Sequence, residues 1–270
     1  MTPFQKIIKR FAFAYAIFLA VINSGGLLSS VAFFGGFLGE DVVTDDLKTY
    51  SLSSDIKNLN IRISAADLYI KEGDSFSVES NLEHLKVEEK DGILTILETK
   101  KIHGNYKGAV LTIYVPAERK FGFTKLTTGA GRLTIDKLSS DTINFELGAG
   151  EVKISSLIAS QSADIDGGAG KITISDGTLN NLDFNMGVGQ LNIRSVLTGE
   201  SEFELGVGES NITVLGIKDN YALDVEKGMG NITVDGISIS NIKDQGNGQD
   251  SIEISGGIGA INIKFEKTQS

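Results

Sequence analysis

The sequence predicts an all-β protein, a parallel β-solenoid with repeats of about 19 residues, preceded by one N-terminal transmembrane helix. Three observations predict this fold. The motif Gly-x-Gly recurs seven times at nearly constant spacing, alternating polar and apolar residues flank each copy, and a long uncharged stretch follows a basic N-terminus. There are 32 glycines but only 2 prolines, so the composition excludes both collagen and a flexible linker.

The N-terminal segment predicts where the protein resides. Lys6, Lys9 and Arg10 precede an uncharged stretch at 11–38, which as a helix would be roughly 42 Å long. A bilayer core of about 30 Å needs only ~20 such residues. Basic flanks stay in the cytoplasm. We therefore expect residues 1–39 to be a basic flank and signal-anchor, with the C-terminal domain outside a single-pass cell membrane.

A cleaved signal peptide is the alternative, and it would release a secreted protein. Residues 11–22 resemble an apolar h-region, and small or polar residues follow at 23–26. Apolar sequence resumes at 27–38, however, and no A-x-A site follows the h-region, which favours the uncleaved anchor. The chain has no cysteine, which excludes both a lipid-modified N-terminus and disulfides.

The region 40–128 is predicted to start and cap the solenoid. Asp91-Gly92 is a hairpin signal, and Pro116 ends a strand. Residues 64–70 look like a degraded copy of the glycine unit. Alternation predicts strands at 56–64, 67–71, 76–80, 85–89, 93–97 and 111–115.

The region 129–270 holds the repeats, with successive spacings of 19, 20, 19, 19, 22 and 29 residues. Glycine suits a sharp corner because it reaches positive φ without a Cβ penalty. The predicted corner glycines are Gly129, Gly131, Gly148, Gly150, Gly168, Gly170, Gly187, Gly189, Gly206, Gly208, Gly228, Gly230, Gly257 and Gly259.

Each unit is predicted to contain a strand, a glycine corner, a second strand and an apolar corner. The fifth copy, at 208–214, carries one extra residue and predicts a bulge. The predicted inward column before the corners is Phe145, Ile165, Phe184, Phe203 and Val225, and the predicted apolar anchors are Leu138, Leu157, Ile217 and Ile237.

No unit can bury its own apolar face, so the units must stack. A constant period favours stacking of neighbouring units in register, as parallel coils of a solenoid. An antiparallel meander or barrel is the alternative, but it would leave the constant order of the two strand types unexplained.

One outer wall of the predicted solenoid is acidic. Like charges ~4.8 Å apart on adjacent coils repel by ~0.9 kcal/mol in water, so cations would relieve the wall. A docking face for cations, cationic peptides or envelope polymers is one interpretation, and a merely solubilising surface is the other. The wall comprises Glu146, Asp164, Asp166, Asp183, Glu202, Glu204, Asp224 and Glu226, with Asn144 and Asn185 among them.

Other kinds of site find little support. A net charge of −10 argues against nucleic acid. The Gly-x-Gly copies lack the third glycine and following helix of a dinucleotide site, and the polar loop 244–250 lacks EF-hand order, so an ordinary insertion is favoured over ion binding there. His84 and His103 are expected to be surface residues. Stacked carboxylates can serve polysaccharide-cleaving enzymes, but these repeat evenly, and we predict no catalytic, metal or cofactor site.

Several segments carry a family resemblance: the glycine-pair units, 67–70 (DLYI), 93–96 (ILTI) and 111–116 (LTIYVP). Across roughly 50–265 the chain resembles a bacterial β-strand-repeat family labelled "putative adhesin" or domain of unknown function. Members with one N-terminal membrane segment resemble proteins of Gram-positive envelope-stress operons. The resemblance implies a non-enzymatic, membrane-anchored surface or envelope-stress accessory protein. A self-assembling membrane-tethered scaffold is the alternative, and an adhesin proper is a third.

Overall fold

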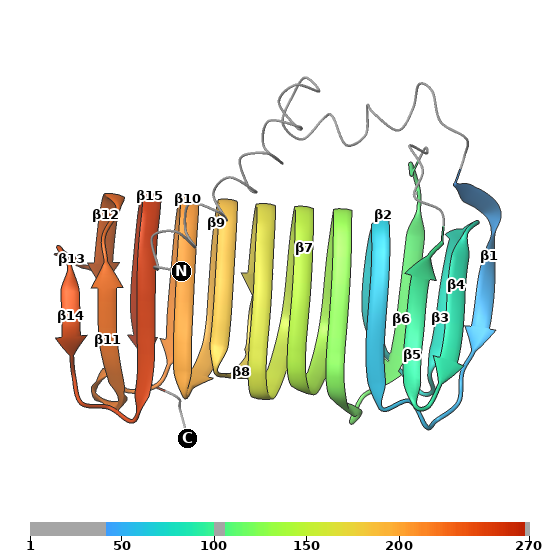
Figure 1. Ribbon diagram of the computed structural model, residues 1–270, viewed down its shortest axis with the longest axis horizontal. Coiled ribbons are helices and arrows are strands. Elements are labelled where there is room, and N and C mark those ends of the chain that lie inside the picture. The colour runs from blue at the N-terminus through green and yellow to red at the C-terminus, as the bar shows by residue number, and fades with distance from the viewer. Residues whose placement is uncertain (1–41, 100–105, 268–270) are drawn as a thin grey trace.

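The computed structural model describes residues 42–99 and 106–267, which form one 15-stranded sheet wound into coils (Figure 1). The long strands bend at the corners and continue into the next arm of a coil, so β7 alone covers 55 residues. The elements are β1 (Val43–Ser51), β2 (Asn58–Gly73), β3 (Ser77–Leu82), β4 (Leu85–Lys90), β5 (Ile93–Glu98), β6 (Val110–Pro116), β7 (Lys120–Ile174), β8 (Gly177–Asn180), β9 (Leu182–Thr198), β10 (Glu200–Leu215), η1 (Lys218–Asn220), β11 (Tyr221–Glu226), β12 (Met229–Val234), β13 (Ile237–Ile239), β14 (Ile242–Gln245) and β15 (Asp250–Glu266).

The coils stack in parallel and in register, as the solenoid prediction requires. Phe184 of β9 pairs with Ile165 of β7 on one side and with Phe203 of β10 on the other. All five residues of the predicted inward column are at most 1% exposed. Because these strands are parallel, the antiparallel meander or barrel is excluded.

The C-terminal part of the repeat region departs from simple sequential stacking. The last unit, β15, pairs with β10 on one side and with both β11 and β12 on the other. The seventh Gly-x-Gly unit therefore lies between the fifth and the sixth. The expectation that neighbouring units always stack is wrong here, because the excursion through β13 and β14 lets the chain return into the stack.

Both ends of the solenoid are closed by antiparallel strands. At the N-terminal end β3 pairs with β6 and β4 with β5, and at the C-terminal end β13 pairs with β12 and β14 with β11. The hairpin predicted at Asp91-Gly92 is confirmed, with φ of 53° and 74°. Asp235-Gly236 forms an equivalent turn that was not predicted, with φ of 50° and 77°. Positive φ at both positions is typical of the type I′ turn, whose twist matches the strands.

The degraded copy at 64–70 stacks on the first true repeat. Ala65 pairs with Ala130, and Leu68 pairs with Leu133. The sheet therefore continues without a break from the region 40–128 into the region 129–270.

Two smaller expectations are wrong. No bulge follows Gly208, because Ser210 pairs with Leu191 and the register continues unbroken. Serine occupies an inward position where the other units have leucine, isoleucine or valine. Leu138 and Leu157 are buried anchors as predicted, but Ile217 and Ile237 are 48% and 70% exposed. Ile217 precedes the turn η1, and Ile237 lies in a capping hairpin, so neither reaches the core.

The predicted signal-anchor lies outside the described residues. Within 42–99 and 106–267 no helix is long and apolar enough to cross a membrane. The anchor and its topology stay predictions.

Candidate functional site: the acidic wall and the glycine edge

The acidic wall is present on the outer face before the glycine corners, but its order differs from the expected one. Glu253 of β15, which was not predicted to belong to the wall, pairs with both Glu202 and Asp224. The expected adjacency of Glu202 and Asp224 is therefore wrong. The first column runs Asn144, Asp164, Asp183, Glu202, Glu253 and Asp224.

The second column of the wall is interrupted by polar residues. Asp166 pairs with Asn185, and Asn185 with Glu204. Ser255 then lies between Glu204 and Glu226. The acidic charge is therefore densest along the first column, where five carboxylates follow one another from Asp164 to Asp224.

Neutral and basic side chains contact the carboxylates of the wall toward its N-terminal end. Lys125 Nζ lies 3.3 Å from Glu146 Oε1, and Asn144 donates a hydrogen bond to Asp164 at 3.1 Å. Asn185 donates to Asp183 Oδ1 at 2.9 Å. These contacts lie away from the C-terminal end of the wall, where Glu253 is found.

The face after the glycine corners carries mixed charges. Lys153 lies 2.8 Å from Glu151, and its hydrogen bond lowers the pKa of that carboxyl. Hydrogen bonds, first from Lys264 and then from Arg194, lower the pKa of Glu266. Because these carboxylates have cationic partners, the excess of negative charge lies on the wall before the corners.

The glycine edge, made of residues 64–66 and the seven Gly-x-Gly corners, brings the coils into backbone contact. A Cβ at Gly150 would lie 1.8 Å from the carbonyl oxygen of Gly131, and φ there is +145°. Gly148 needs no positive φ, but its Cβ would lie 2.0 Å from the carbonyl oxygen of Gly129. The edge therefore requires glycine mainly because a side chain would separate adjacent coils.

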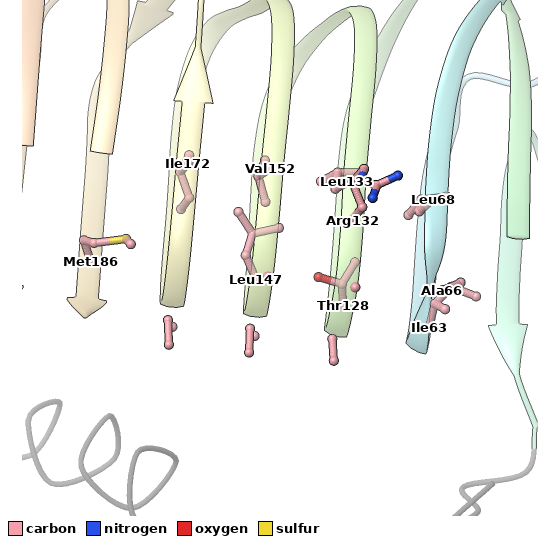
Figure 2. Close-up of a pocket in the computed structure, with 17 residues that line it drawn as sticks. Ile63, Ala66, Leu68, Thr128, Arg132, Leu133, Leu147, Val152, Ile172 and Met186 are labelled. Carbon is pink, nitrogen blue, oxygen red and sulfur yellow. The ribbon is translucent and has the colours of Figure 1, made fainter. Parts of the chain in front are cut away.

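Apolar residues lie at the surface along this edge. Core side chains next to the corners keep some exposure, 6% for Leu147 and 7% for Val152, and they line a shallow recess (Figure 2). The middle residues of the corners form a column that we call the apolar ridge: Ala130, Ala149, Ala169, Val188, Val207, Ile258 and Met229.

Residues 105–268 match the family model described as Toastrack DUF4097. The chain belongs to this family. Since the family is a domain of unknown function, the match supplies no catalytic or binding residue. Comparison with curated proteins gave no match.

Several solved structures are similar to this toastrack protein. One from Clostridium sporogenes, described as a putative cell adhesion protein, shares 17% identity over 82% of this chain and 99% of its own, with a TM-score of 0.34. A putative adhesin from Bacteroides fragilis shares 12% identity over 83% and 98%, with a TM-score of 0.41. A putative lipid binding protein from Parabacteroides distasonis shares 16% identity over 84% and 98%, with a TM-score of 0.40.

The polar loop 244–250 has a structural role. In the loop 244–250, Asp250 accepts a hydrogen bond from the Gly199 amide at 2.7 Å, which fixes the start of β15. His84 lies 3.6 Å from Glu83 at the surface, whereas His103 is outside the described residues. Among the residues that the structure describes, no three His, Cys, Asp or Glu side chains group closely enough to hold a metal ion.

A buried polar network at the N-terminal part of the glycine edge was not predicted. Glu98 accepts hydrogen bonds from the Ser64 amide at 2.6 Å and from the Tyr106 hydroxyl. Burial, with help from this hydrogen bond, raises the pKa of Tyr106 to about 12. No local pattern signals the network, because its members come from three separate segments.

Proposed function

We propose that this toastrack protein is a non-enzymatic accessory protein of the bacterial envelope, anchored in the membrane by residues 11–38, and that its acidic wall binds cationic peptides. The single observation that carries the proposal is the run of paired carboxylates from Asp183 through Glu202 and Glu253 to Asp224. Each lies one strand spacing from the next, about 4.8 Å, so a cationic partner would lower the repulsion between them.

The even repetition of carboxylates in the first column of the wall supports binding rather than catalysis. A general acid and base need different environments, so that the pKa of one carboxyl rises while the other stays low. Carboxylates at equivalent positions of similar coils have nearly equivalent surroundings. The wall therefore suits a ligand with repeated positive charge, such as a cationic peptide of the kind that provokes envelope stress.

Self-assembly into a scaffold is less well supported. The terminal coils are covered by antiparallel strands, and the edge strand β4 carries Lys86, Glu88 and Lys90. Charged edge strands are a common protection against edge-to-edge pairing.

Binding of the full chain to polylysine tests the proposal. The variant Asp183→Asn/Glu202→Gln/Glu253→Gln removes three consecutive charges of the first column. Each charge is worth ~1 kcal/mol at about 4 Å in water, so at low salt we expect affinity to fall by at least about tenfold. In wild type the binding should weaken as salt rises.

The matched control is Asp45→Asn/Asp46→Asn/Asp74→Asn, which removes three exposed carboxylates outside the repeats. This control changes the net charge by the same amount as the wall variant, and it should retain most of the affinity for polylysine. Equal loss in both variants would mean that net charge alone governs binding, and unchanged binding in the wall variant would refute the docking role.

A further inference from the structure

The apolar ridge becomes larger and more exposed toward its C-terminal end. Alanine occupies its first three positions, whereas Val207, Ile258 and Met229 end it and are 37%, 46% and 70% exposed. These three lie on adjacent strands, because Ile258 pairs with Val207 on one side and with Met229 on the other. An exposed apolar cluster thus ends the glycine edge.

The chain joins the sheet at this same edge. Val42 accepts a hydrogen bond from the Glu83 amide at 2.9 Å, and Val43 pairs with Leu82 at the end of β3. β3 pairs with β6, whose start lies beside Asp67, directly after the corner at 64–66. The first described residue is therefore level with the glycine edge, where β1 begins in Figure 1.

Another apolar residue of similar exposure lies at the opposite edge. Ile217 follows Gly216, whose amide bonds to Glu266 at the end of β15. Eight residues of extended chain separate Gly208 at the corner from Gly216, and they span at most about 26 Å. The two edges are thus far enough apart to be distinguished by depth in a membrane.

The linker between the predicted anchor and the sheet is short. The uncharged stretch ends at Leu38, four residues before Val42, and four residues span at most ~14 Å. If the anchor of the proposed function holds, the N-terminal end of the glycine edge lies close to the bilayer surface.

We infer that the glycine edge rests on the membrane surface, with Val207, Ile258 and Met229 as a second attachment. The inference depends on the anchor in the proposed function. About ten strand spacings separate β1 from β12, so the second attachment lies roughly 48 Å from the first. The edge would then lie along the bilayer, and the acidic wall would face sideways.

A bilayer fits the ridge better than a protein partner does. The ridge is one residue wide, whereas a stable protein interface needs a broad patch of ~800 Å² on each side. Shallow insertion of single apolar side chains is the way that peripheral surfaces contact the headgroup boundary. Lys227 precedes the corner of Met229, where its ammonium can reach headgroup phosphates.

The absence of cysteine makes site-specific labelling straightforward. Ile258→Cys and Ile217→Cys replace the same residue type at 46% and 48% exposure on opposite edges. Each full-length variant is labelled with a fluorophore and reconstituted in phosphatidylcholine nanodiscs containing a headgroup-nitroxide lipid. Because Ile217 lies at the opposite edge, up to ~26 Å farther away, we expect quenching at position 258 to be at least about twofold stronger. Met229→Cys, labelled likewise, should match position 258.

The quenching and co-migration results distinguish a failure of the membrane-facing edge from a failure of the anchor. Co-migration of the chain with nanodiscs, with equal quenching at 258 and 217, would overturn only the membrane-facing edge. Failure to co-migrate would overturn the anchor and this inference with it. Concentration-dependent self-quenching at 258 without lipid quenching would show that a second copy covers the ridge, which also overturns it.

Discussion

Asn262 donates a hydrogen bond from its side-chain amide to Oδ1 of Asn211 at 2.9 Å, although 51 residues separate the two in the chain. Asn211 in turn donates to Asn192 at 3.0 Å, and Thr233 donates to Asn262 at 2.9 Å. This ladder follows the order of the strands in space, which places the last unit inside the stack. It also gives the inserted strand a specific polar contact on each side.

The ladder predicts measurable coupling between Asn211 and Asn262. Each hydrogen bond contributes about 0.5–1.5 kcal/mol, so Asn262→Ala should lower the free energy of unfolding by about 1–3 kcal/mol. In a double-mutant cycle measured by urea denaturation, Asn211→Ala and Asn262→Ala should couple by about 1 kcal/mol. Additive effects would contradict the contact. Asn192→Ala, which loses one of these bonds, should cost less than Asn262→Ala.

The position of β15 predicts the result of removing residues 250–270. The strands β11 and β12 would lose their parallel partner, so residues 216–245 should become susceptible to protease. Trypsin should cleave at Lys227 early in the truncated chain and late in the full chain. If the sixth unit instead stacked on the fifth, Lys227 would stay protected after truncation.

Substitutions at three glycines separate the two reasons for glycine in this fold. Gly236 has φ of +77°, but no atom lies within 4 Å of the position that a Cβ would take, so Gly236→Ala should cost about 1 kcal/mol from strain alone. Gly148→Ala adds a clash without positive φ, and Gly150→Ala adds both. We expect Gly150→Ala to cost about 3 kcal/mol or more, the largest loss of the three in urea denaturation. A similar loss at all three sites would contradict the role of coil contact.

The raised pKa of Tyr106 predicts a loss of stability at high pH. The folded pKa of about 12 exceeds the usual value of 10, so the folded state holds the proton more tightly. The stability that this raised pKa contributes is fully present below pH 10 and is lost as the pH rises toward 12. Tyr106→Phe should therefore flatten the fall in unfolding free energy across this range. Burial also raises the pKa of Tyr114 and Tyr221, so the comparison with wild type is the decisive measurement.

The glycine spacing and alternation predicted the coils well, because both are local. Phe184 and its column are buried as expected, and the corner at Gly150 cannot accept a side chain. The bulge after Gly208 was wrong because Ser210 in an inward position made the pattern look one residue longer. Ile217 and Ile237 were misjudged because an apolar residue at a corner is buried only when a neighbouring coil covers it.

The sequence by itself determined that this protein folds into parallel coils with glycine corners and one acidic face, since period-two alternation and the needs of a sharp corner act within a single unit. Only the tertiary structure decided which coils are neighbours. Every unit offers the same apolar column and the same backbone hydrogen bonds, so the units are nearly interchangeable in a stack. The hairpin at Asp235-Gly236 and the ladder through Asn262 resolve that degeneracy, and they place Glu253 in the acidic wall and Ile258 in the apolar ridge.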